Sequence, residues 1–201
     1  MNIKSYITDF LTHYQARLKR VLFLFVLGGV IGVVTAFVYP SFIQNILDTF
    51  SDKFGPDPAL NLKLVFGIFE QNLIVSIIAW IGGLVLALPP ILIVLSNGFI
   101  LGYVIAFIAS AFSSPGHTFV FLSAGLLPHA IFELPAFLIA AALGMSIGLD
   151  WLKLGSRGQR LKVLGQSFKR SAKYFLIVLI LLLIAAFIEV YVSGHLVDKL
   201  S

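Results

Sequence analysis

Residues 118–149 read TFVFLSAGLLPHAIFELPAFLIAAALGMSIGL, and this stretch decides how the chain folds. An α-helix needs about 20 apolar residues to cross the hydrocarbon core of a bilayer. The stretch is too long for one straight crossing and too short for two, and Pro128 and Pro135 interrupt it. Because proline removes a backbone donor and kinks or breaks a helix, we predict one crossing preceded by a re-entrant or half-helix piece over about 118–128.

The rest of the chain also indicates a membrane protein. Of its 201 residues, 59% are hydrophobic and only 11% are charged, whereas a soluble domain carries roughly 25% charged residues. Further apolar runs lie at about 21–39, 72–95, 98–112 and 174–193. The predicted fold is therefore a single, all-α, polytopic transmembrane helical bundle of about five spans, with one broken segment and short amphipathic interfacial helices. This composition excludes a soluble enzyme and a nucleic-acid-binding domain.

The charges predict an orientation in the cell membrane. Residues 1–20 and 150–173 hold most of the lysines and arginines, whereas residues 41–71 carry more acidic than basic side chains. An excess of Lys and Arg marks the cytoplasmic side. We therefore predict a cytoplasmic amphipathic arm over 1–20, an external amphipathic cap over 41–71 and a basic cytoplasmic amphipathic loop over 150–173. The C-terminus is then external.

Three pairs of glycines have the GxxxG spacing that lets helix backbones approach closely in lipid: Gly28 and Gly32, Gly98 and Gly102, and Gly144 and Gly148. They predict packing within the chain or contacts with a second copy.

Residues 88–102 (LPPILIVLSNGFILG) also align without gaps with residues 134–148 (LPAFLIAAALGMSIG). Internal repeats are common in transporters, although matches between common membrane residues also arise by chance.

His129 and Glu133 are the main polar residues within the apolar regions, and a spacing of four places them on one helix face. Such a pair can relay protons, bind a metal ion or act as a general acid and base. Alternatively, the two side chains hold each other and cap broken backbone. The other histidines, at 13, 117 and 195, are predicted near helix ends or outside, and Glu189 is predicted in water near the outer end of the last span. We therefore assign no catalytic, cofactor or metal-ligating residues, and the cofactor stays unknown.

Two asparagines are predicted to shape the backbone. Asn72 is placed at the opening of the second span, and Asn97 with Gly98 in a turn between the second and third spans, where asparagine and glycine are favoured. For both, a cap or turn role is a simpler interpretation than a ligand role.

Together these motifs resemble the stage II sporulation protein M family of integral membrane proteins. The specific part is Pro128-His129-x-x-Phe132-Glu133-Leu134-Pro135, preceded by Asn72 and Asn97-Gly98-x-x-x-Gly102 and followed by Gly144-x-x-x-Gly148. At residue 130, where the family pattern leads us to expect glycine, the chain has alanine. The resemblance implies a multi-pass membrane protein that anchors peptidoglycan-degrading partners in sporulating bacteria without cutting the wall itself.

Three functions remain open on this basis. The first is a non-enzymatic scaffold that recruits protein partners, such as cell-wall enzymes, at the membrane. The second is a transporter or channel for ions or small solutes that uses the broken segment with His129 and Glu133. The third is an intramembrane metal-dependent hydrolase. The expected surroundings are the lipid bilayer, protein partners and a second copy of the chain, and no nucleic acid.

Overall fold

The computed structural model describes residues 2–42, 60–111, 114–152 and 157–198, and these ranges are helical and contain no strand. The elements follow in the order α1 (Ile3–Val38), α3 (Leu62–Ile81), the 3₁₀ turn η1 (Gly82–Leu84), α4 (Leu88–Ala111), α5 (Pro115–Gly125), α6 (Leu127–Leu152), α7 (Arg157–Ile188), the π-helix η2 (Glu189–Gly194) and α8 (His195–Asp198). Most of the predicted external cap lies outside the described residues. Its last part, residues 62–71, belongs to α3.

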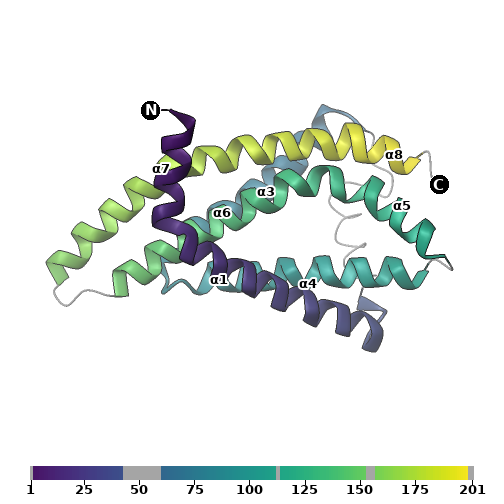
Figure 1. Cartoon of the computed structure of the whole chain (residues 1–201), viewed down its shortest axis with the longest axis horizontal. Helices are drawn as coiled ribbons and strands as arrows, with labels where there is room; N and C mark the ends of the chain where they lie inside the picture. Colours follow the sequence, from purple (N-terminus) through teal and green to yellow (C-terminus); the bar gives the residue numbers. More distant parts are fainter. Residues whose placement is uncertain (1, 43–59, 112–113, 153–156, 199–201) are drawn as a thin grey trace.

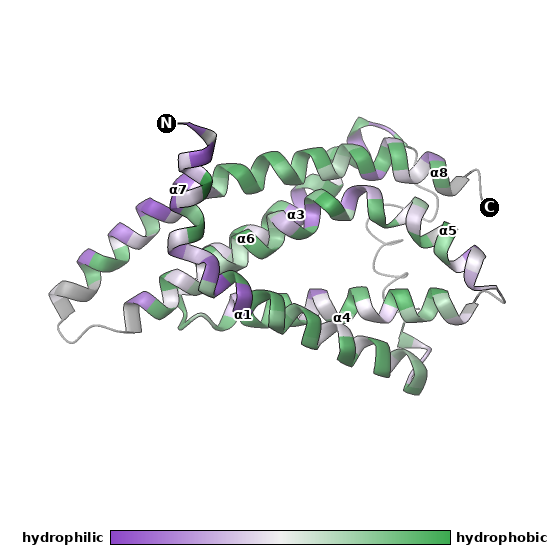
Figure 2. Ribbon diagram, viewed as in Figure 1, coloured by the Kyte–Doolittle hydropathy of each residue, from purple (hydrophilic) through white to green (hydrophobic). Residues whose placement is uncertain are grey.

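In these ranges, five helices are long and apolar enough to cross a membrane: Lys4–Val38, Leu62–Leu84, Leu88–Ser110, Leu127–Asp150 and Leu161–Gly194. The prediction of an all-α bundle with five spans is therefore confirmed. The helices form an elongated bundle (Figure 1), and their hydrophobic residues dominate its length (Figure 2). In the described residues, the basic segments predicted at the membrane surface continue without a break into spans: residues 3–20 belong to α1 and residues 157–173 to α7.

The turn between the second and third spans lies at residues 85–87, well before its predicted place. Leu86 and Ala87 have φ angles of 54° and 61°, in the left-handed region that residues other than glycine rarely adopt. Pro89 and Pro90 follow in the first turn of α4, where the missing N–H of proline is tolerated. These prolines therefore lie at the beginning of the third span.

The predicted positions of both asparagines are wrong. Asn97 lies in the middle of α4, and its Nδ2 donates a hydrogen bond to the carbonyl oxygen of Ile93 at 2.9 Å. The asparagine amide is thus satisfied inside the helix and makes no turn. Asn72 lies in the middle of α3. The helix instead begins after Asn61, whose Oδ1 accepts a hydrogen bond from the backbone N–H of Leu64 at 3.1 Å.

Helices α1 and α4 touch through glycines. A Cβ added to Gly98 would overlap the carbonyl oxygen of Phe25. One turn later, a Cβ added to Gly102 would overlap the carbonyl oxygen of Gly29. Because both contacts advance by four residues in the same direction, the two helices run parallel. The same contact includes Gly28 and Gly32.

Helices α3 and α6 repeat this contact. A Cβ added to Gly144 would overlap the carbonyl oxygen of Ala79, and one added to Gly148 would overlap that of Gly83. The aligned segments 88–102 and 134–148 therefore occupy equivalent positions in two parallel helix pairs. Helices α3 and α6 run opposite to α1 and α4 (Figure 1), so the two pairs are antiparallel to each other.

The predicted broken segment consists of α5 and the start of α6. Helix α5 has 11 residues, a length of about 16 Å that is too short to cross a bilayer. It ends at Gly125, and α6 begins at Leu127, so the break precedes Pro128 by a few residues. Pro135 lies inside α6 and does not end it; its missing N–H instead withdraws a helical donor from the carbonyl group of Ile131.

Helix α6 is the centre of the bundle. In the apolar 18-residue stretch of this span, 61% of the residues are buried. In the corresponding stretches of the other four candidate spans, 28–33% of the residues are buried. Its small residues Ala140 and Ala141 are fully buried and belong to two different hydrophobic clusters. Any polar side chain on the inward side of α6 is therefore surrounded by other helices.

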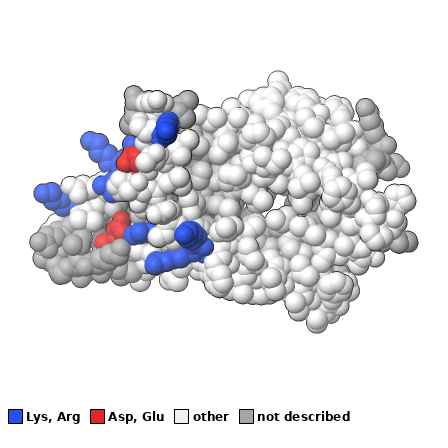
Figure 3. Space-filling model, viewed as in Figure 1, with Lys and Arg blue, Asp and Glu red and all other residues white. Residues whose placement is uncertain are grey.

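Lysines and arginines gather at one end of the molecule, over the N-terminal parts of α1 and α7 (Figure 3). Two ion pairs tie the helices together at this basic end. Lys173 Nζ lies 2.8 Å from Asp9 Oδ2, and Arg17 lies 2.9 Å from Asp150 Oδ1. The first pair is more than one-third exposed, whereas the side chains of the second are 19% and 26% exposed.

Candidate functional site

His129 and Glu133 lie on the first turns of α6, on the same face of the helix. His129 Nε2 is 4.0 Å from Glu133 Oε2, and the two side chains are 12% and 30% exposed. The break between α5 and α6 immediately precedes them, and proline flanks the pair at 128 and 135. The Pro-His-x-x-x-Glu-x-Pro string thus places an imidazole and a carboxylate side by side within a candidate membrane span.

A second pair of polar residues comes from η2 and meets the first. His129 Nδ1 lies 3.3 Å from Ser193 Oγ, and Ser193 is buried. One ligand atom each from His129, Glu133 and Glu189 lies within 4.8 Å of the other two. We call these four residues, His129, Glu133, Glu189 and Ser193, the His–Glu cluster.

The π-helical turn η2 sets the position of Glu189 and Ser193. A π-helix bonds i to i+5, and such turns occur mostly as single bulges inside α-helices, frequently at functional sites. Val190 anchors η2 in a hydrophobic cluster with Val65 and Ala186. At the end of the turn, a Cβ on Gly194 would come within 2.9 Å of a methyl carbon of Leu60. The turn η2 is therefore packed against α3 and against Leu60, which precedes α3.

The cluster combines a nitrogen ligand, two carboxylates and a hydroxyl. Such a set can bind a metal ion or pass a proton along hydrogen-bonded groups. In the described part of the chain, the ion pairs of lysine and arginine lie at the basic end, away from these carboxylates. Two carboxylates repel each other unless a cation or a shared proton lies between them, so the cluster can hold either a cation or a proton.

From the sequence, only two of the four residues of this cluster could be identified. The sequence identified His129 and Glu133 but placed Glu189 in water, whereas Glu189 faces the other two side chains. The sequence does contain an indication of the second pair: Glu189 and Ser193 are four residues apart, as are His129 and Glu133, so each pair lies on one helix face. What the sequence could not supply was the packing of η2 against α6.

The other predicted residues serve different parts of the fold. Asn72 and Asn97 lie mid-helix in α3 and α4, and the six predicted glycines lie in the contacts between parallel helices. Of the remaining histidines, His117 and His195 are exposed, at the starts of α5 and α8. His13 lies at the basic end, 3.3 Å from Asp9.

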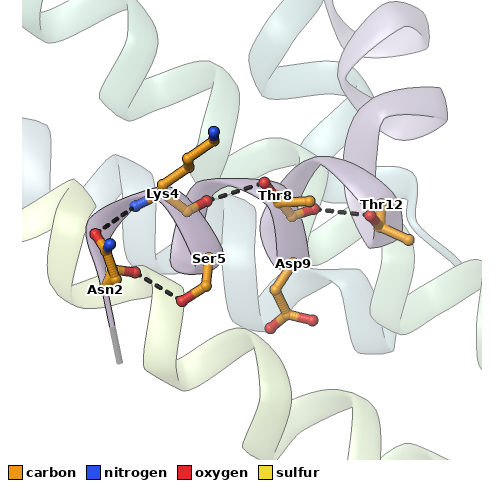
Figure 4. Close-up of a pocket in the computed structure, with 6 residues that line it drawn as sticks. All are labelled: Asn2, Lys4, Ser5, Thr8, Asp9 and Thr12. Carbon is orange, nitrogen blue, oxygen red and sulfur yellow. Dashed lines mark hydrogen bonds between the residues drawn. The ribbon is translucent and has the colours of Figure 1, made fainter.

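A shallow hollow beside the first turns of α1 is a weaker candidate (Figure 4). Its serine and threonine side chains hydrogen-bond to the backbone of their own helix, and Asp9 is paired with Lys173 of α7. Ser5 Oγ donates to the carbonyl oxygen of Asn2 at 2.7 Å, and Thr8 Oγ1 donates to that of Lys4 at 2.9 Å. One helix face supplies all of the lining residues. The hollow is therefore a polar helix surface, and the His–Glu cluster remains the better candidate site.

Comparison with known proteins supports the sequence resemblance. A family model described as Stage II sporulation protein M matches residues 21–194. The uncharacterized protein MJ0793 of Methanocaldococcus jannaschii is 30% identical over 180 residues, which cover 89% of this chain and 94% of the relative. The uncharacterized protein MJ0706 of the same organism is 26% identical over 135 residues, or 64% of this chain and 55% of the relative. No solved structure matches.

Proposed function

Because the chain belongs to the stage II sporulation protein M family of membrane proteins, we propose a function at membrane depth for it: a transporter or channel that conducts a cation through the His–Glu cluster. The observation that carries this proposal is the convergence of His129, Glu133 and Glu189 from two candidate spans. Ionisable residues inside membrane spans are costly and mark ion pathways and proton relays. The two matched relatives are themselves uncharacterized, so they add no function of their own.

Two features of the backbone support transport. Transporter sites lie where helices are discontinuous, near the interface between inverted repeats. Here the break before α6 and the π-helix η2 both adjoin the cluster. The parallel pairs α1·α4 and α3·α6 are antiparallel to each other, and α6 belongs to one of them. A relative movement of the two pairs would therefore change the surroundings of His129.

We assign the orientation from the charges. Lysine and arginine favour the cytoplasmic side, so the basic ends of α1 and α7 are placed in the cytoplasm. Helix α6 begins at the opposite end of the bundle (Figure 1). The His–Glu cluster then lies in the outer part of the membrane, where a cation enters from outside.

The test is cation flux into vesicles reconstituted with the purified protein. Vesicles that hold a pH-sensitive or cation-sensitive dye should show a faster signal than empty vesicles when a gradient is applied. The double variant Glu133→Gln, Glu189→Gln should reduce this flux to the level of empty vesicles, because amides keep the shape and remove both charges. Glu70→Gln is the matched control, since Glu70 is exposed on α3.

Flux that survives the double variant would contradict a pathway through the cluster. The absence of flux of protons, monovalent cations and divalent cations from the unmodified protein would contradict transport itself. Both tests require folded variants that insert into the vesicles. A single symmetric peak in size-exclusion chromatography in detergent checks the first condition, and co-flotation of the protein with the vesicles checks the second.

A scaffold function is the second candidate, and family membership favours it. In this case the chain recruits protein partners at the membrane, with cell-wall enzymes as the partners that the family implies. Crosslinking in intact membranes should then capture a partner, and capture should be lost on deletion of 43–59, within the predicted external cap, yet persist in the Glu133→Gln, Glu189→Gln variant. Capture that depends on the two glutamates and not on residues 43–59 would contradict this role.

A further inference from the structure

We infer that His129, Glu133 and Glu189 form a three-ligand site for a divalent transition metal ion, with Ser193 as the residue that positions the imidazole. The inference deepens the proposed function, on which the role of the metal as transported cation rests. The site itself rests on the geometry and chemistry of the four side chains.

The distances suit a metal ion. Ligand atoms about 2.0–2.2 Å from a tetrahedral metal ion lie roughly 3.3–3.6 Å apart. His129 Nε2 and Glu133 Oε2 are already 4.0 Å apart, and the three ligand atoms all lie within 4.8 Å of one another. A small rotation of the flexible glutamate side chains closes the remaining gap. The helices need not move to admit the ion.

The contact with Ser193 fixes which imidazole nitrogen faces the ion. His129 Nδ1 lies 3.3 Å from Ser193 Oγ, whereas Nε2 is the atom that faces Glu133. With the hydrogen on Nδ1, donated to the hydroxyl oxygen, the lone pair lies on Nε2, the nitrogen that faces the Glu133 carboxylate. Histidines that bind metals almost always donate their second N–H to a fixed partner in this way.

The net charge of the three ligands also matches that of a divalent cation. A neutral imidazole and two carboxylates carry two negative charges, which a divalent cation balances in surroundings that penalise net charge. An imidazole ligand favours zinc, copper, iron or nickel, because magnesium and calcium prefer an all-oxygen shell. A monovalent ion would leave one charge uncompensated. The class that fits is therefore a divalent transition metal.

Three protein ligands leave coordination positions free. Closed structural zinc sites fill four positions with protein ligands, whereas sites at which the metal exchanges or reacts keep one open. Two of the three side chains, His129 and Glu133, are also 12% and 30% exposed, so the protein does not fully enclose the three ligands. An accessible, incomplete shell of this kind suits a metal that must enter and leave.

The test is metal binding to the full chain in detergent after treatment with a chelator. Titration with Co²⁺ should give visible absorption bands that saturate at one ion per chain, and Zn²⁺ should displace the Co²⁺ while excess Mg²⁺ should not. Ser193→Ala should weaken binding by about 10- to 100-fold and shift the bands, the usual effect of removing an orienting partner. His129→Ala, Glu133→Gln and Glu189→Gln should each weaken it at least as much.

Two controls address loss of folding and surface binding. His195→Ala and Glu70→Gln each remove a group of the same type from an exposed position and should leave the titration unchanged. A monodisperse profile in size-exclusion chromatography shows that each variant is folded. Binding that fails in the unmodified protein, or that persists in the folded Glu133→Gln, Glu189→Gln variant, would overturn the site.

The outcomes separate this site from the proposed function. Stoichiometric metal binding without flux in vesicles supports the site and contradicts transport. Flux of protons or monovalent cations without metal binding supports transport and contradicts the site. Zinc flux that is lost together with Co²⁺ binding in the same variants supports both.

Discussion

Replacement of Gly144 by leucine is expected to destabilise the bundle by about 3 kcal/mol or more, since overpacking against backbone cannot be relieved by a rotamer change. Any Cβ at this position would overlap the carbonyl oxygen of Ala79 and approach that of Trp80. Helices α3 and α6 would have to separate along their length. The measurement is the midpoint of thermal unfolding in detergent, followed by tryptophan fluorescence, together with the yield of monodisperse protein.

Gly165→Leu is the matched control. Gly165 lies in α7, and a Cβ there would meet nothing within 4 Å. Leucine is also the better helix former, so this variant should be as stable as the unmodified protein or gain up to about 1 kcal/mol. If Gly144→Leu unfolded at the same temperature as Gly165→Leu, the close contact of α3 with α6 would be disproved.

Loss of Arg17 is expected to have the next largest effect. Its guanidinium lies 2.9 Å from Asp150 Oδ1 and joins α1 to the end of α6. The carboxylate also accepts hydrogen bonds from Ser146 and Ser167, at 3.2 and 3.3 Å. Removing one partner of a buried pair costs about 3–5 kcal/mol. Because both side chains keep some exposure, we expect a loss at the lower end of that range for Arg17→Met, which preserves the apolar stem.

A double-mutant cycle with Asp150→Asn isolates this pair. The two substitutions together should cost about 1–3 kcal/mol less than the sum of their separate effects. Lys173→Met is the internal comparison, because the Lys173–Asp9 pair is more exposed and such pairs contribute only about 0–1 kcal/mol. Additive effects of Arg17→Met and Asp150→Asn would show that the close approach contributes nothing to stability.

The sequence predicted the class of fold well, because lipid imposes a simple rule on composition. Long apolar runs with few charges must be helices in a bilayer, where every backbone group needs an internal partner. The break ahead of Pro128 was also expected from the length of residues 118–149. Both predictions rest on properties of whole segments, which do not depend on knowing which helices are neighbours.

Predictions at the level of single turns failed where tertiary packing outweighed local preference. Asn97-Gly98 is a favoured turn sequence, yet Gly98 is needed where α4 crosses α1, and Asn97 bonds to its own helix. The actual turn uses Leu86 and Ala87 at positive φ, for which these residue types carry no signal. Glu189 was misplaced for a related reason, since only the contact between η2 and α6 brings it to His129.

The interleaved order of the helix pairs has a consequence for synthesis. Helix α1 enters the bilayer first, but its partner α4 follows only after α3. Until then the glycine face of α1 is covered by lipid, since helices insert individually before they associate. A nascent chain that ends after α3 contains no complete pair, one that ends after α4 contains α1·α4, and only one that reaches the end of α6 contains both. Assembly thus proceeds in a fixed order, and the His–Glu cluster, which needs residues 189–193, is completed last.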